Sequence, residues 1–203
     1  MTIWRPAIAA ALALALSACV SLPAPIGAGT GFRNDPALRG LWYGKTDKDG
    51  DAAYYHVLLN GDDTATVVGV GAGARNDDKG GWGVLTVTTV ALAGNNFINV
   101  REVFENGKPK SDPENPAAWY SGLYRLDGDV LIVYAFDEKK VAAEVKAKHI
   151  AGTITQGRFG DNIAITADAA HVDKWLSAPG AAALFTPLFR LHRVKEPNLP
   201  PAP

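Results

Sequence analysis

The sequence predicts a mainly β protein, built as a single closed or nearly closed antiparallel β-barrel with two short helices. Three observations carry this prediction. Short runs rich in Val, Ile, Thr and aromatic residues recur along the chain and are separated by Gly, Asn and Asp turn signals. Only two stretches combine a helix-capping acid with apolar residues at helical spacing. A chain of 203 residues is also long enough to bury one sizeable core.

The expected strands follow one another through most of the chain and are joined by short turns. Asp127-Gly128-Asp129 is a hairpin signal between two apolar runs, and Asn106-Gly107 is a strong turn pair. In order, the expected strands are 39–46, 53–60, 64–70, 82–92, 96–105, 118–126, 130–136, 150–156, 162–166 and 187–194. Short strands at this spacing favour a barrel or a sandwich.

Two helices are expected late in the chain. Asp137 can cap a helix over Glu138–Lys148, whose basic residues at the carboxyl end suit the helix dipole. Asp168 can cap a second helix over Ala169–Ser177, which places its apolar residues on one face.

The first 18 residues have the layout of a secretory signal. Arg5 precedes the apolar run Ala7–Leu16, and small residues follow it. The run is too short to cross a bilayer as a helix, which needs about 20 apolar residues. Leu16-Ser17-Ala18-Cys19 then resembles the lipobox of bacterial lipoproteins. The alternative is an ordinary secretory signal followed by a chance cysteine.

The lipobox resemblance implies a cellular location and a lipid anchor. It implies diacylglycerol transfer to the Cys19 sulfur, cleavage before Cys19 and N-acylation, so that palmitate-like chains hold the protein on a membrane. Val20 is not the Asp that would resemble an inner-membrane retention signal. The expected location is therefore the bacterial cell envelope, on the periplasmic face of the outer membrane.

Composition divides the rest of the chain. Pro, Gly and Ala dominate residues 19–35, which we interpret as a lipidated tether, followed by a barrel domain over 36–195 and a Pro-rich tail over 196–203.

The net charge of −1 shows no basic excess, which argues against nucleic acid as a partner. Cys19 is the only cysteine, so its lipidation leaves no thiol for a disulfide or a zinc site.

A G-x-W motif opens the first expected strand. Gly40-Leu41-Trp42 resembles the first signature of lipocalins and the wider calycin group. The resemblance implies that Trp42 plugs one end of the barrel while a basic residue of the last strand stacks on it, for which Arg193 is the first choice and Arg190 the second. Lys45 departs from the signature, and the later lipocalin loop motif is missing. The chain is also similar to uncharacterised proteobacterial lipoproteins.

Four residues are candidates for ligand binding inside the barrel. Tyr54 and His56 share one face of an expected strand, while Glu102 and Arg125 lie on apolar faces of two others. An acid and a base on such faces could form a buried ion pair. The alternative is that these faces point outward at the rim of the barrel.

Other motifs favour neither metal nor cofactor chemistry. Asp47, Asp49 and Asp51 alternate as in a calcium loop, but the glycine and the final glutamate of that loop are missing. Residues 69–74 resemble a dinucleotide loop without the helix that must follow it. No histidine pair has metal-ligand spacing, and no Ser stands in G-x-S-x-G. We therefore expect no enzyme activity, no cofactor and no metal.

The expected function is that of a lipid-anchored envelope protein whose barrel binds a small apolar or amphipathic ligand. The alternative is a structural or assembly lipoprotein with a packed barrel that acts through contacts with an envelope protein. A barrel of about eight strands is compatible with both, because its interior can be filled by side chains or hold one small ligand.

Overall fold

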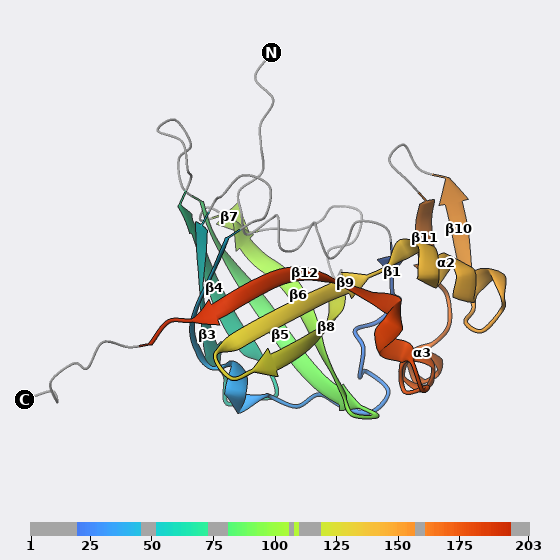
Figure 1. The fold of residues 1–203 in the computed structure, drawn as a ribbon, viewed down its shortest axis with the longest axis horizontal. Coiled ribbons are helices and arrows are strands. Elements are labelled where there is room, and N and C mark those ends of the chain that lie inside the picture. The colour runs from blue at the N-terminus through green and yellow to red at the C-terminus, as the bar shows by residue number, and fades with distance from the viewer. Residues whose placement is uncertain are drawn as a thin grey trace, which may run out of the picture.

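A computed structural model describes residues 20–45, 52–72, 81–105, 108–109, 119–156 and 161–195 (Figure 1). The signal segment, Cys19 and the Pro-rich tail 196–203 lie outside the described residues. So do the acidic repeat at 47–51 and the turn pair at 106–107. No helix in the described part of the chain is long and apolar enough to cross a bilayer.

The central feature is a closed antiparallel barrel of eight strands, which confirms the predicted fold class. Its strands pair around the ring in the order β2-β3-β4-β5-β6-β8-β9-β12, and β12 returns to β2. The short β7 (Lys108–Pro109) pairs with β6 outside the ring. The bounds are β2 Gly40–Lys45, β3 Ala52–Leu59, β4 Ala65–Ala72, β5 Trp82–Leu92, β6 Asn95–Glu105, β8 Tyr120–Asp127, β9 Val130–Phe136 and β12 Phe185–Arg193.

Tight hairpins position several of these strands, because local turn chemistry sets strand register. Between β5 and β6, Ala93 and Gly94 both have positive φ, at 48° and 81°. Between β8 and β9, Gly128 has a φ of 56° at the predicted Asp-Gly-Asp turn. Most expected strands agree with the structure to within two residues at each end, since alternating patterns bounded by turn residues locate strands well.

The inward faces of the barrel strands form one apolar core. Alternate residues point inward along each strand, as the two-residue repeat of a pleated strand requires. The bulkiest inward side chains lie in the middle and toward one end of the barrel. This core includes Trp42, Tyr55, Val57, Val67, Leu85, Val87, Val100, Tyr124, Leu131 and Val133.

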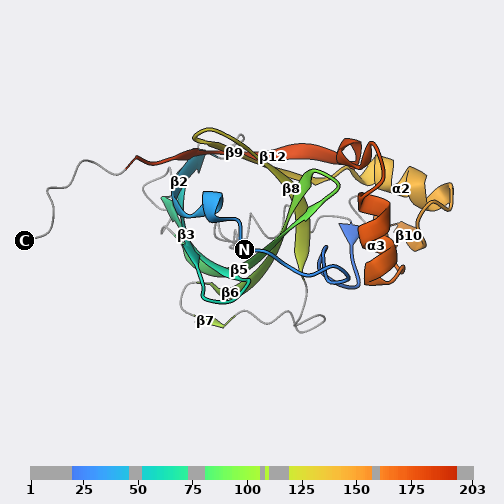
Figure 2. The ribbon, with the colours of Figure 1, turned by 90° about the horizontal axis from the view of Figure 1, so that it is seen from below.

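A second layer packs against the outside of the barrel. It contains β1 (Val20–Ser21), β10 (Gly152–Gln156), β11 (Asp161–Ile165), α2 (Glu138–Lys146) and α3 (Ala169–Leu176). Figure 2 shows these elements beside the barrel, on the side of β8 and β9. The two helices were predicted, and Asp137 and Asp168 cap them. The layer buries the outward residues Val90, Phe97, Leu123 and Phe136 in a second core.

Residues 20–35 do not form a tether, and this prediction is wrong. Val20 and Ser21 pair in parallel with Ile163 and Ala164 of β11, so the first two described residues already belong to a sheet. Ile26 is fully buried in the second core. The prediction failed because a high content of Pro, Gly and Ala is typical of flexible linkers. In this segment, however, the apolar residues pack in the second core and the glycines allow the turns that the packing requires.

Candidate functional site

One end of the barrel is sealed, and we call it the closed end. The 3-10 helix η1 (Pro36–Leu38) lies across it in Figure 2. Trp42 is fully buried beneath η1 and donates its indole N–H to the Leu38 carbonyl at 2.8 Å. The Arg193 guanidinium lies 4.1 Å from the centroid of the Trp42 ring, a cation–π distance.

Arg193 also holds η1 to the last strand. Its guanidinium donates to the carbonyls of Arg39 and Ala37, both at 2.5 Å, and its Nε lies 3.7 Å from Asp129. Arg190, the second choice for this contact, is exposed on the opposite face of β12. The guanidinium therefore stacks on the plug residue and satisfies helix carbonyls at the same time, which a lysine could not do.

A tyrosine closes the same end from a second direction. The Tyr124 hydroxyl donates to the Asp35 carboxylate at 2.7 Å. Burial, together with this bond to a carboxylate, raises the pKa of the Tyr124 phenol well above its usual range. The closed end is thus held by two side chains that reach back to the residues on either side of η1.

The inner wall is different toward the end opposite η1, which we call the open end to distinguish it from the closed end; most residues that connect the strands there lie outside the described part of the chain. Strands β3, β4 and β5 present small buried residues there, paired across the sheet as Ala53 with Gly71 and Gly69 with Gly83. Tyr55 follows Ala53 on the inward face, and burial raises the pKa of its phenol to about 12. Because these inward residues are small, their side chains fill little of the barrel interior toward the open end.

Glu102 is a charged residue on this inner wall. Its side chain is only 9% exposed, and it pairs with Leu85 on the face that also carries Val100. A bulge at Val103 follows, because Val84 pairs with Phe104 while Leu85 pairs with Glu102. Of the four predicted ligand-binding residues, Glu102 is the one that the structure places inside the barrel.

Three of the predicted ligand-binding residues face outward, so the prediction of one shared cavity is wrong. Tyr54 and His56 are exposed, because their strand buries the alternate face of Ala53, Tyr55 and Val57. Both faces of that strand carry large side chains, so alternation alone could not decide which one closes the barrel.

Arg125 is also exposed, so of the two alternatives considered for this residue the structure shows the outward face and not a buried ion pair with Glu102. Its guanidinium lies on the outer wall, 5.7 Å from the centroid of Tyr134, while the neighbouring Tyr124 points inward. The two charged side chains are therefore separated by the wall of the barrel.

The outward side chains near the open end form a cross-strand row of aromatic and apolar residues. Tyr43, Tyr54, Val70 and Trp82 pair in register across β2, β3, β4 and β5, and we call them the aromatic row. Tyr54, Val70 and Trp82 are 43%, 50% and 42% exposed. The Tyr43 and Tyr54 rings lie 5.0 Å apart. Each residue is within two positions of the strand end at the open end.

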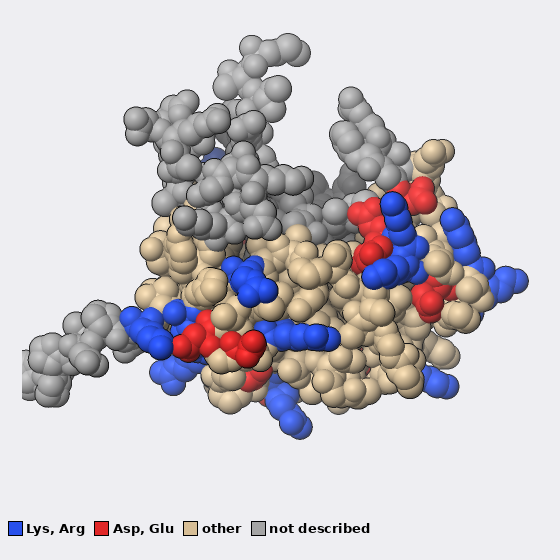
Figure 3. Space-filling model, viewed as in Figure 1, with Lys and Arg blue, Asp and Glu red and all other residues tan. Residues whose placement is uncertain are grey.

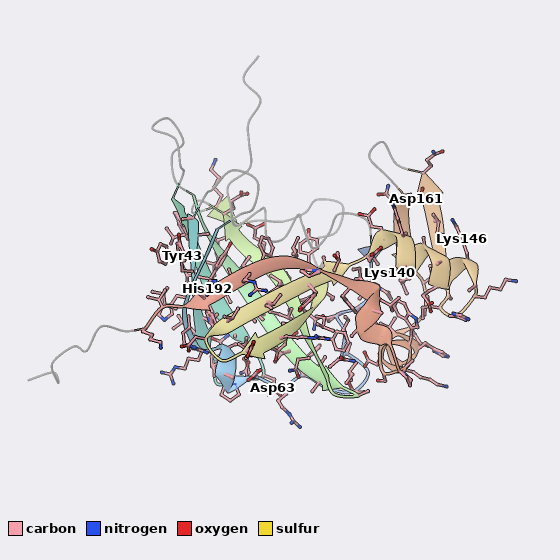
Figure 4. The ribbon with its side chains drawn as sticks, in the orientation of Figure 1. Tyr43, Asp63, Lys140, Lys146, Asp161 and His192 are labelled. Carbon is pink, nitrogen blue, oxygen red and sulfur yellow. The ribbon has the colours of Figure 1, made fainter. Side chains whose placement is uncertain are left out.

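A hollow of about 440 Å³ adjoins the aromatic row on the outer wall. It lies where β12 bulges between Pro187 and Phe189 and leaves the register of β9. Tyr43, Tyr134, Arg190 and His192 are among its lining residues, and Figure 4 shows Tyr43 and His192 close together on this wall. The hollow is a surface feature separate from the barrel interior.

A wider groove of about 830 Å³ runs between α2 and α3. It holds two histidine–carboxylate pairs, His149 with Glu144 at 3.2 Å and His171 with Asp168 at 2.8 Å. The backbone N–H of His171 donates to Asp168 and lowers the pKa of that capping carboxyl. All four side chains are exposed or half-exposed, and charges of both signs are interspersed over this part of the surface (Figure 3). Among the described residues, no three metal-ligating side chains come together.

Two buried polar residues that sequence reasoning missed hold the N-terminal segment. The Asn99 side chain bonds both the N–H and the carbonyl of Ile26, and the Asp173 carboxylate accepts from the N–H groups of Gly27 and Gly29. The available signal was an acid beside the apolar face of a helix, together with a glycine-rich segment whose N–H groups need acceptors.

These features define the class of the protein: a closed, eight-stranded antiparallel barrel that is sealed at one end by a tryptophan–arginine contact and carries a second layer outside. Comparison with protein-family models, with curated proteins and with solved structures finds no significant match.

Proposed function

We propose that the protein is a lipid-anchored component of a bacterial cell envelope, whose barrel binds a small apolar or amphipathic ligand through its open end. The observation that carries the binding proposal is the asymmetry of the inner wall. Large side chains fill the barrel toward the closed end, whereas Ala53, Gly69, Gly71 and Gly83 face inward toward the open end.

The anchor is argued from the sequence. Leu16-Ser17-Ala18-Cys19 has the pattern of a lipobox, and the preceding segment has the layout of a secretory signal. Each buried methylene contributes about 0.8 kcal/mol of membrane affinity, so two or three acyl chains on one residue give stable attachment. The absence of Asp after Cys19 favours the outer membrane over the inner one.

The inner wall favours an amphipathic ligand with a hydrogen-bond donor. Most buried inward side chains are apolar, so they would bind the hydrocarbon chain or ring of a ligand by burying its apolar surface. Glu102 would accept a bond from an amine, amide or hydroxyl at the polar end of the ligand. The proposed ligand is therefore a slender amphiphile whose polar group reaches the level of Leu85.

Native mass spectrometry of the lipidated protein, purified from its own envelope, tests this function directly. A co-purifying small molecule is expected, and its mass identifies the ligand class. Repeated preparations that carry no ligand would contradict the proposal.

A titration with a fluorescent fatty acid gives a second readout. Ala53→Leu places a large side chain on the small inward wall and should weaken binding at least tenfold. Ala52→Leu makes the same change at the neighbouring half-buried position, on the outward face of β3, and is the matched control. Equal binding by both variants would argue against an interior site.

The second candidate function is that of an assembly lipoprotein that binds an envelope protein. The aromatic row favours it, because aromatic side chains are enriched where proteins contact one another. Under this function Ala53→Leu leaves the activity intact, while Tyr54→Ser and Trp82→Ser abolish capture of the partner. The two sets of variants therefore separate the two functions.

A further inference from the structure

We propose that the open end of the barrel faces the leaflet that holds the Cys19 lipid, with the aromatic row at the level of the lipid headgroups. This inference rests on the proposed lipid anchor and adds an orientation to it. Three observations support it: the short length of chain between Cys19 and the folded domain, the direction in which the chain enters the fold, and the position of the aromatic row.

The first observation is that little chain separates Cys19 from the folded domain. Val20 is already paired with Ile163 in β1. Asn99 then bonds both backbone groups of Ile26 at 2.9 Å, and Asp173 holds the loop that follows. Consecutive Cα atoms are about 3.8 Å apart, so a lipid on Cys19 holds β1 against the membrane surface.

The second observation is the direction of the chain. From β1 it passes Asn99 at Ile26, bonds Thr89 at Arg33, and then enters η1 at the closed end. Figure 1 shows this blue segment descending from β1 toward η1. Because β1 is parallel to β11, its upstream end points toward Asp161, which lies away from the closed end in Figure 4. The chain therefore enters β1 at Val20 from the side of the open end.

The third observation is the position of the aromatic row. It lies on β2 to β5, while β1 lies on the opposite side of the barrel in both Figure 1 and Figure 2. Figure 4 shows Tyr43 nearer the open end than Asp63, which lies at the closed end. The upstream end of β1 and the aromatic row thus lie toward the same end of the barrel, on two different sides of it. Two separated contacts define an orientation, which one anchor alone does not.

The chemistry of the row suits a bilayer surface. Tyr and Trp have an apolar ring and a polar end, and they concentrate where hydrocarbon meets headgroups. Tyr54, Val70 and Trp82 are each more than a third exposed and adjoin one another across paired strands. With the lipid holding the domain at the membrane, the leaflet is the apolar surface closest to them. An amphiphile could then exchange between the leaflet and the barrel.

Depth measurement on the full lipidated protein tests the orientation. Tyr54→Cys and Leu58→Cys place a single label on the same outward face of β3, at parent side chains that are 43% and 42% exposed. The two positions are about 13 Å apart along the strand, at 3.3 Å per residue. Cys19 is the only native cysteine and is blocked by its lipid, so a bimane label reacts at the introduced thiol alone.

The labelled proteins are reconstituted into vesicles that contain phosphatidylcholine brominated on its acyl chains. We expect bromine to quench the label at residue 54 at least threefold more strongly than the label at residue 58. Equal quenching, or stronger quenching at residue 58, would overturn the orientation. A label at residue 54 that is shielded from water in the native envelope but not quenched in vesicles would also overturn it, in favour of a protein partner.

Flotation of the same vesicles separates this inference from the anchor. Lipidated protein that floats while residue 54 is unquenched has an anchor but not the proposed orientation. Protein that does not float, and whose Cys19→Ser variant behaves identically, has no anchor, which overturns the proposed function as well.

Discussion

Asn99 pairs with Ile26 as a neighbouring strand would. Its amide nitrogen donates to the Ile26 carbonyl and its oxygen accepts from the Ile26 N–H, both at 2.9 Å. Asn99 is fully buried, and Ser121 and Thr88 complete its hydrogen bonds. One side chain on the outer wall of the barrel thereby holds a chain segment 73 residues away in sequence.

Asn99→Leu should destabilise the protein by about 2 to 4 kcal/mol, because two buried backbone groups of Ile26 lose their partners. Urea denaturation measures the change in the free energy of unfolding. Asn96→Leu, at an exposed position of the same strand, is the control. A loss at residue 99 no larger than that of the control would contradict this account of the segment.

Asp173→Ala should release residues 26–30 from α3 without unfolding the barrel. The carboxylate is buried and accepts from two backbone N–H groups and the Thr30 hydroxyl, so its removal leaves those donors unpaired. Limited trypsin digestion should cut after Arg33 at least tenfold faster than in the parent protein. Lys174→Ala alters an exposed residue of the same helix and should leave that rate unchanged.

Arg193→Lys should cost about 1 to 2 kcal/mol of stability, although the charge is kept. Lysine cannot donate to the Arg39 and Ala37 carbonyls while it stacks on Trp42. Thermal unfolding of this variant is compared with that of Arg190→Lys, whose residue is exposed on the other face. Equal melting temperatures would show that the closed end does not depend on the guanidinium.

Stability should fall as the pH rises from about 10 to about 12. Burial raises the pKa of Tyr55 to about 12 in the folded protein, from 10.0 in the unfolded chain. The stabilisation is complete below the unfolded pKa and is lost as the pH rises through the folded pKa. It amounts to about 2 to 3 kcal/mol. Alkaline denaturation of Tyr55→Phe, which has no phenol to ionise, should show a smaller decrease over this interval.

Cys19→Ser should abolish labelling of the protein by radioactive palmitate and leave the precursor uncut. The serine hydroxyl is a poor replacement for the thiol that accepts the diacylglycerol group. Cell fractionation and gel mobility report the two effects. Unchanged membrane retention and a normal mature mass would contradict the anchor.

Strand positions were predicted well because they depend on local chemistry. The strand over 82–92 and the hairpin around Asp127-Gly128-Asp129 agree with the structure, since alternation and turn residues act over a few positions. Asp137 and Asp168 likewise cap the helices they were expected to cap. The contact of Arg193 with Trp42 was expected from a resemblance rather than from the pattern alone.

The direction of each strand face was harder to predict. Tyr54 and Tyr55 are neighbours with the same side chain, and one is exposed while the other is buried in the core. The residues of that strand are apolar or aromatic on both faces, so the sequence pattern had no preferred side. The same ambiguity placed Arg125 inside the barrel, whereas it lies on the outer wall.

The sequence by itself determined the fold class, the strands and the helix caps, and its lipobox-like pattern predicts an anchor at Cys19, because each depends on residues close together in the chain. Only the tertiary structure decided which faces point inward and whether residues 20–35 are free or packed. Those outcomes depend on contacts between distant residues, such as Ile26 with Asn99 and Gly27 with Asp173. The physical reason is that burial and hydrogen-bond satisfaction are properties of the assembled layers, and a strand that is apolar on both faces can satisfy either arrangement until its neighbours are in place.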